Sequence, residues 1–145
     1  VPESEMSGSN SGVAVDQDCL DAFTDLKLGH KLRFVVYKLN DDNTAIVKES
    51  QAGPEATYDD FVKALPENEC RYGVFDFEYE VDGGKRNKIV FVVWAPDSAK
   101  IKSKMLVASS KDAFRKQLVG IGTEVQATDL SEVDYQATLE KVMRK

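Results

Sequence analysis

The chain has 145 residues, of which 42% are hydrophobic and 30% are charged, and its formal net charge is −6. A chain of this length is expected to fold as one domain with a sizeable core. Its acidic balance argues against general nucleic-acid binding, and no apolar run approaches the roughly 20 residues of a membrane-spanning helix. Its two cysteines, Cys19 and Cys70, lack metal-type spacing and are interpreted as reduced thiols of a cytoplasmic protein.

In the first half of the chain, the residue pattern predicts a tail, two helices and two strands. Residues 1–10 are polar and aperiodic, so we expect a flexible tail, with residues 1–5 interpreted as an expression remnant ahead of Met6. Asp16 or Asp18 is expected to cap a helix that reaches about Leu28, with Leu28 on its apolar face. The next two strands and a short helix are expected over residues 33–39, 44–49 and 58–65.

In the second half of the chain, the residue pattern predicts three strands and two helices. Residues 71–81 alternate between apolar and polar side chains, which is typical of a strand with one buried face. Residues 89–94 form a continuous apolar run and are expected to be buried on both faces of a sheet. A long helix over residues 101–118, ended by Gly120 and Gly122, should precede a short strand over residues 124–127 and a final helix capped at Ser131. The order of elements predicts an α/β (α+β) fold with helices on both faces of a mixed central sheet.

The long helix has an unusual outer face. At about 100° per residue, Lys111 and Arg115 lie within about 20° of Lys104, and Met105 lies near 100°. The apolar stripe, which includes Val107 and Phe114, lies on the opposite side. An unbranched apolar side chain among charges suits contact with a partner, although a solvated helix with one stray methionine fits the same pattern.

Charge is distributed unevenly along the chain. From residue 100 onward nine Lys/Arg stand against six Asp/Glu, whereas the preceding residues carry ten against nineteen. A relatively basic C-terminal third suits an acidic protein partner or an anionic headgroup, and a chance gradient is the alternative.

No residue pattern nominates a catalytic or metal site. His30 is the only histidine, which excludes most histidine-based metal sites and weakens any nucleophile–histidine scheme. The segment Gly120-Ile121-Gly122 follows a predicted helix and lacks the third glycine of a nucleotide fingerprint. We therefore expect a protein that is not an enzyme.

The segment from Trp94 to Asp112 has the pattern W-x-P-D-x-A-x-x-x-S-K-M followed by S-S-K-D, and it resembles the actin-binding helix of the actin-depolymerizing factor (ADF)/cofilin family. Three further segments also resemble this family in the same order: Ser11-Gly12-Val13-Ala14-Val15, Tyr72-Gly73-Val74-Phe75-Asp76-Phe77-Glu78-Tyr79 and Gly120-Ile121-Gly122-Thr123-Glu124-Val125-Gln126-Ala127-Thr128-Asp129. The resemblance covers residues 11–145, and the short loops look closest to fungal members. It implies a single ADF-homology domain with a mixed five- or six-stranded sheet between helices.

The resemblance implies two actin-binding surfaces. The first, for monomers and filaments, comprises Ser11, Gly12, Val13, Lys102, Lys104, Met105, Lys111, Asp112, Arg115 and, at its margin, Lys116. Met105 should fill an apolar cleft on actin while lysines pair with acidic groups around it. The second, needed for filaments, comprises Arg86, Lys88, Glu140, Lys141 and Arg144. From the residues alone, Arg86 and Lys88 also fit solubilising charges at a strand end.

The implied function is to bind ADP-actin monomers and filaments, to sever and depolymerize filaments, and to promote actin turnover, as a monomer without a cofactor. Ser11 matches the family's regulatory phosphorylation site, with Ser7 and Ser9 as competing serines, and a phosphate there should weaken actin binding. The same basic residues could bind phosphoinositide headgroups. Proteins of actin turnover are further expected partners. The expected location is the cytoplasm and cortical actin cytoskeleton; nuclear presence stays open, although only Lys85-Arg86 remains of the family's basic import run.

Two alternatives remain open at this point. One is a related module that binds actin without severing, as coactosin-like proteins do, and the other is a phosphoinositide-binding module of the same fold. Fragmentation of filaments separates the first from the leading hypothesis, and vesicle binding that survives saturating actin would favour the second.

Overall fold

The computed structural model describes residues 12–144. Its strands form one six-stranded sheet in the order β1-β3-β2-β4-β5-β6. The strands are β1 (Ala14–Val15), β2 (Phe34–Leu39), β3 (Ala45–Ala52), β4 (Arg71–Val81), β5 (Gly84–Trp94) and β6 (Ile121–Ala127). The helices are α2 (Gln17–Lys27), α3 (Tyr58–Lys63), α4 (Ile101–Gln117) and α5 (Tyr135–Met143), with a 3₁₀ helix η1 (Leu130–Val133) before α5.

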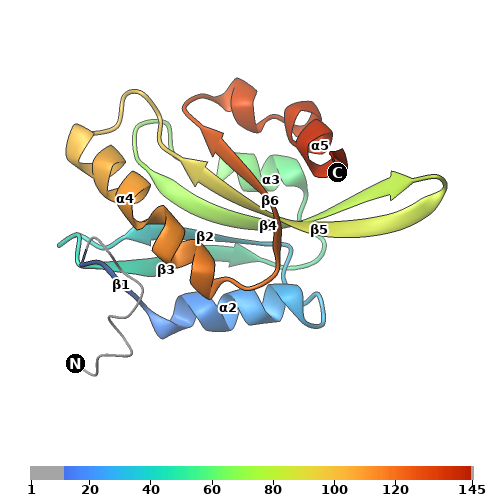
Figure 1. Cartoon of the computed structure of the whole chain (residues 1–145), viewed down its shortest axis with the longest axis horizontal. Helices are drawn as coiled ribbons and strands as arrows, with labels where there is room; N and C mark the ends of the chain where they lie inside the picture. The colour runs from blue at the N-terminus through green and yellow to red at the C-terminus, as the bar shows by residue number, and fades with distance from the viewer. Residues whose placement is uncertain (1–11, 145) are drawn as a thin grey trace.

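The sheet is mixed because its two edge strands run parallel to their neighbours. Strand β1 pairs in parallel with β3, and β6 pairs in parallel with β5, whereas the four central strands are antiparallel. Strands β4 and β5 pair along their whole length, from Arg71 opposite Trp94 to Val81 opposite Gly84. Their hairpin projects well beyond the helices, at the right of Figure 1.

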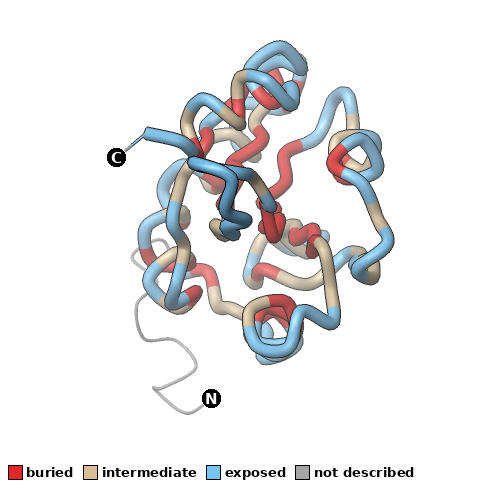
Figure 2. The backbone as a smooth tube through the Cα atoms, turned by 90° about the vertical axis from the view of Figure 1, so that its right-hand side faces the viewer, coloured by how far each residue is buried: buried red, intermediate tan, exposed pale blue. Residues whose placement is uncertain are grey.

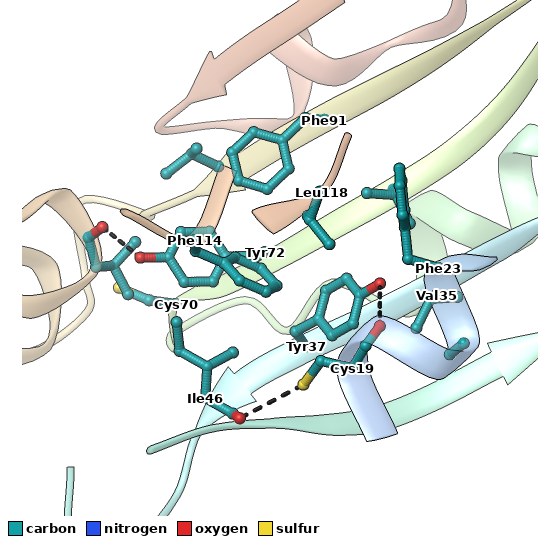
Figure 3. Close-up of a cluster of buried hydrophobic side chains, with 14 of the residues drawn as sticks. Cys19, Phe23, Val35, Tyr37, Ile46, Cys70, Tyr72, Phe91, Phe114 and Leu118 are labelled. Carbon is teal, nitrogen blue, oxygen red and sulfur yellow. Dashed lines mark hydrogen bonds between the residues drawn. The ribbon is translucent and has the colours of Figure 1, made fainter. Parts of the chain in front are cut away.

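Helices α2 and α4 cover one face of the sheet and bury a cluster of aromatic and aliphatic side chains (Figures 1 and 3). Phe114 of α4 packs edge-on against Tyr37, with ring centroids 5.0 Å apart. The hydroxyl of Tyr72 donates a hydrogen bond to the carbonyl oxygen of Val107 in α4, and that of Tyr37 donates to the carbonyl of Cys19 in α2. These bonds satisfy buried hydroxyls and fix both helices against the sheet.

Helices α3 and α5 and the 3₁₀ helix cover the opposite face. Tyr58 of α3 is buried there, donates its hydroxyl proton to the carbonyl of Val133 at 2.7 Å, and shares a 2.8 Å hydrogen bond with Thr138 of α5. One hydroxyl thus ties three elements together. In Figure 2, most buried stretches of the backbone face the interior of the molecule, and the exposed stretches lie around them.

The fold class predicted from the sequence is confirmed, and residues 90–94 are buried on both faces as predicted, whereas Ile89 is only partly buried. Val90 and Val92 belong to the cluster under α3 and α5, whereas Phe91 and Val93 belong to the cluster under α2 and α4. The two cysteines are free and buried, as expected of reduced thiols.

Three boundaries differ from the sequence prediction. Strand β5 begins at Gly84, because hairpin pairing with β4 satisfies the backbone groups of its polar first half. Gly122 lies within β6 and does not end the preceding helix. Helix α5 is capped by Asp134, whose carboxylate accepts from the backbone N–H of Ala137, while Ser131 lies inside the 3₁₀ helix.

The prediction for the end of α2 was partly wrong. The helix ends at Lys27, with Gly29 in a left-handed conformation (φ 91°) after it, as a helix stop requires. Leu28, however, is 62% exposed and does not belong to the apolar face. Helical periodicity no longer applies once the backbone of Leu28 has left the helix for an extended conformation.

Candidate functional surfaces

Helix α4 has the inner face that the sequence predicted. Val107, Ser110 and Phe114 are buried against the sheet, and Leu118, which follows the helix, is buried with them. Because the inner face of α4 is packed against the sheet, the opposite face of the helix points to solvent. We call the outward residues Lys102, Lys104, Met105, Lys111, Asp112, Arg115 and Lys116, together with Ile101, the α4 surface.

The α4 surface carries two exposed apolar side chains, not one. Met105 is 65% exposed, in agreement with the predicted outer position. Ile101, one helical turn earlier, is 72% exposed and was missed by sequence reasoning. Its spacing of four residues from Met105 places both on one side of the helix, and that spacing was the signal that could have identified it. Together they form a larger apolar anchor than a single methionine could provide.

The two lysines beside this anchor, Lys102 and Lys104, differ in exposure and in hydrogen bonding. Lys102 is exposed, whereas Lys104 is partly buried and its Nζ donates to the carbonyl oxygen of Asp97 at 3.1 Å. Lys104 is thus held against the turn that precedes α4, with its ammonium group at a fixed place. Lys116 and Asp112 are exposed toward the other end of the helix.

Glu124 of β6 links the two remaining cations and was not anticipated. Its carboxylate accepts hydrogen bonds from Lys111 Nζ at 3.0 Å and from the Arg115 guanidinium. Partial burial would raise the pKa of Glu124, but hydrogen bonds from Gln126, Lys111 and Arg115 outweigh this and hold its pKa below the ordinary value. The bridge fixes the last two turns of α4 to β6 and partly neutralises this end of the α4 surface.

The N-terminal segment lies beside β3 and α2. Val13 is only 3% exposed and belongs to the core under α2 and α4. Its side chain therefore anchors the segment and does not face outward, contrary to the expectation of a surface contact. Gly12 before it is exposed, with a φ of 82°. Ser11, the predicted phosphorylation site, lies outside the described residues.

The structure brings the β4–β5 hairpin and the end of α5 together. Lys88 Nζ donates to the carbonyl oxygen of Val142 at 2.7 Å and thus satisfies a carbonyl in the last turn of the helix. Lys88 is therefore not simply a solubilising charge. Arg86, two residues before Lys88 on the same strand, is exposed, which fits both a filament contact and a solubilising charge. We call Arg86, Lys88, Glu140, Lys141 and Arg144 the hairpin–α5 surface.

Within residues 12–144, no cluster of three or more His, Cys, Asp and Glu side chains could hold a metal ion. No helix in that part of the chain is long and apolar enough to cross a membrane. Burial is the main reason that the pKa of Cys19 is raised to about 12, so this thiol stays protonated at physiological pH. What the described surface offers is a rigid arrangement of apolar and charged groups suited to protein binding.

Comparison with known proteins agrees with a protein-binding domain of this fold. The family model described as cofilin/tropomyosin-type actin-binding protein matches residues 12–143, and the chain belongs to that family. It is 58% identical to cofilin of Mycosarcoma maydis over 136 residues, which are 93% of this chain and 97% of that protein. It is 54% identical to actophorin of Acanthamoeba castellanii over 134 residues, or 92% and 97% of the two chains.

A solved structure supports the same assignment. The crystal structure of Streptomyces griseoflavus cofilin superposes with a TM-score of 0.86 at 49% identity, covering 92% of this chain and 98% of that one. The predicted membership of the ADF/cofilin family, and the likeness to fungal cofilins, are thereby confirmed.

Proposed function

We propose that this protein binds actin monomers and filaments through the α4 surface, binds filaments additionally through the hairpin–α5 surface, and severs and depolymerizes filaments. The observation that carries the proposal is the exposed Ile101–Met105 pair on a rigid helix, with Lys102 and Lys104 beside it. A central apolar anchor inside a charged rim is the arrangement from which protein interfaces derive most of their affinity. Membership of an actin-binding family supports actin as the partner.

The two surfaces allow one domain to contact two actin subunits. Lys88 ties the hairpin to α5, and Glu124 ties α4 to β6, so each surface is held to the same six-stranded sheet. A rigid ligand that prefers one filament geometry shifts the filament toward that geometry by its difference in affinity. Boundaries between occupied and bare segments are then strained, which accounts for severing without cleavage of any covalent bond. Preference for ADP-actin follows if the ADP filament adopts that geometry more readily.

The α4 surface is tested by the Met105→Ala variant. Because Met105 is 65% exposed, burying it on actin should contribute about 1–2 kcal/mol, and its loss should weaken monomer binding about 5- to 30-fold. Leu28→Ala is the matched control, since Leu28 is 62% exposed at the end of α2. Binding is measured with fluorescent ADP-actin, and severing by microscopy of ADP-actin filaments at substoichiometric protein. Equal affinity of the two variants would exclude Met105 as the anchor.

The hairpin–α5 surface is tested by the Arg86→Ala/Arg144→Ala double variant. Both side chains are exposed, so the fold should be kept. We expect monomer binding to be unchanged while co-sedimentation with filaments and severing are lost. Wild-type protein that decorates filaments without breaking them would favour the non-severing alternative. Loss of monomer binding in this variant would contradict the division into two surfaces.

Regulation and location are part of the same proposal. A phosphate on Ser11 would add close to two negative charges to the N-terminal segment and should weaken actin binding, which Ser11→Glu would mimic. Phosphoinositide headgroups should compete with actin for the basic residues Lys102, Lys104, Lys111, Arg115 and Lys116. Binding of the protein to vesicles with and without phosphatidylinositol 4,5-bisphosphate, measured in the presence and absence of actin, tests this competition.

We place the protein in the cytoplasm, on cortical actin, with other proteins of actin turnover as partners.

A further inference from the structure

A concave surface lies on the α3 side of the sheet and borders the α4 surface at the turn before α4, where the Asp97 carbonyl oxygen accepts from Lys104. It is a groove of about 720 Å³ between α3, the turn after β5 and the start of η1. Its apolar lining is contributed by Val62, Leu65, Trp94, Pro96 and Leu130. A volume of this size accommodates a few large side chains of a bound segment. We call this feature the α3–η1 groove.

The floor and one edge of the groove are held in place before any partner binds. The indole N–H of Trp94 donates to the carbonyl oxygen of Pro66 at 2.7 Å, so the only polar atom of that side chain is satisfied. The Ser98 hydroxyl bonds to the carbonyl of Glu67 at 3.2 Å and to the Asn68 amide oxygen at 2.6 Å. These bonds fix the turn after β5 against the loop that follows α3.

Leu130 stands at the opposite edge and is 57% exposed. It begins the 3₁₀ helix, which Asp129 caps by accepting from the backbone N–H of Glu132 and the hydroxyl of Ser131. The cap holds a large apolar side chain at the surface. Leu130 thus faces solvent in a rigid element at the edge of an apolar groove, which is typical of a contact residue.

The charges around the groove are predominantly acidic. Its lining contains four carboxylates, from Asp59, Glu67, Asp97 and Asp129, against one ammonium group, from Lys63. Lys63 Nζ lies 3.0 Å from a carboxylate oxygen of Asp59, so that pair largely cancels. The remaining carboxylates give the rim a negative potential, opposite in sign to the lysine-rich α4 surface. Charge of this sign selects a positively charged partner and steers its approach.

We propose that the α3–η1 groove is a docking site for a short basic segment of a protein partner, in which large aliphatic side chains are flanked by Lys or Arg. The aliphatic side chains occupy the space between Trp94, Val62 and Leu130, and the basic groups pair with the carboxylates of Glu67, Asp97 and Asp129. Because the groove and the α4 surface have opposite charge, they take chemically different partners.

The test uses the full chain and a defined probe, a fluorescein-labelled octapeptide with two Leu side chains flanked by four Lys or Arg. Two control peptides replace the basic residues by Glu or the leucines by Ser. Trp94 is the only tryptophan, so its fluorescence reports directly on occupancy of the groove. We expect saturable anisotropy and a Trp94 signal with the basic apolar peptide alone, and amide shifts in an NMR titration that centre on α3, Trp94 and Leu130.

Variants then separate the groove from the rest of the surface. Leu130→Glu should weaken probe binding about tenfold, because it removes apolar contact area and adds a charge, whereas Leu28→Glu, at a similarly exposed leucine, should leave it unchanged. Glu67→Lys/Asp97→Lys should weaken binding more than Asp41→Lys/Asp42→Lys, which makes the same charge change elsewhere. Equal effects within either pair, amide shifts outside the groove, or equal binding of the acidic peptide would overturn the proposal. So would self-association in sedimentation that Leu130→Glu abolishes, since a second copy would then be the occupant.

Discussion

Replacing Glu124 by Gln removes one negative charge from the bridge that holds α4 to β6 and keeps the shape of the side chain. The carboxylate is shared by Lys111 and Arg115, and the side chains of Glu124, Lys111 and Arg115 are 16%, 20% and 41% exposed. A hydrogen bond to a buried charge contributes about 1.5–3 kcal/mol, whereas an exposed ion pair contributes at most about 1 kcal/mol. The bridge is between these cases, so we expect Glu124→Gln to lower the free energy of unfolding by about 1–2 kcal/mol.

The pH dependence of this effect has a definite sign. The pKa of Glu124 is lowered from its ordinary value of 4.5 in the folded protein. A carboxyl with a depressed folded pKa stabilises the protein above its unfolded pKa, and this contribution is lost as pH falls through the folded value. The difference in stability between wild type and Glu124→Gln should therefore be constant from pH 7 to pH 5.5 and should shrink at pH 3.5.

Thermal unfolding followed by circular dichroism measures this difference. At pH 7 the midpoint of Glu124→Gln should lie about 3–7 °C below that of the wild type. The control is Glu80→Gln, because Glu80 is exposed near the end of β4, and its midpoint should change little. A variant as stable as the wild type at pH 7, or a difference that does not shrink toward pH 3.5, would refute the bridge as a stabilising interaction.

Three further predictions follow from contacts in the core and at α5. Gly73→Ala should lower stability by about 1–3 kcal/mol in chemical denaturation, because the added methyl would lie 2.6 Å from ring carbons of Phe61; an unchanged midpoint would mean that the ring moves freely. Lys88→Met should speed amide hydrogen exchange in α5 relative to α2, because the carbonyl oxygen of Val142 loses its donor, and Lys88→Arg should restore protection. Equal exchange of α5 in the wild type and Lys88→Met would exclude a stabilising cap by Lys88. Cys19 should resist Ellman's reagent at pH 8 until the protein is denatured, because its pKa is raised to about 12 by burial; rapid native labelling would contradict that burial.

The sequence predicted those features that depend on local pattern. The apolar run of residues 89–94 identified the strand buried on both faces, because a strand covered on both sides by helices buries consecutive apolar side chains. Helical periodicity placed Met105 outward and Phe114 inward, and both are so placed. The long motif around Trp94 and Met105 is sufficient to indicate the family.

The tertiary structure decided how distant residues meet. Lys111 and Arg115 look like free cations in the sequence, yet Glu124 of a different element bridges them. Val13 looks like part of a surface segment, yet it fills space under α2 and α4.

The amino-acid order by itself thus determined the elements, the buried faces and the family, because these depend on side-chain periodicity and on motifs within short stretches of chain. Only the folded structure decided which charges are neutralised, that Leu28 is exposed, and that Leu130 and Trp94 line one acidic groove. Those properties depend on distances between residues far apart in sequence, which periodicity does not encode.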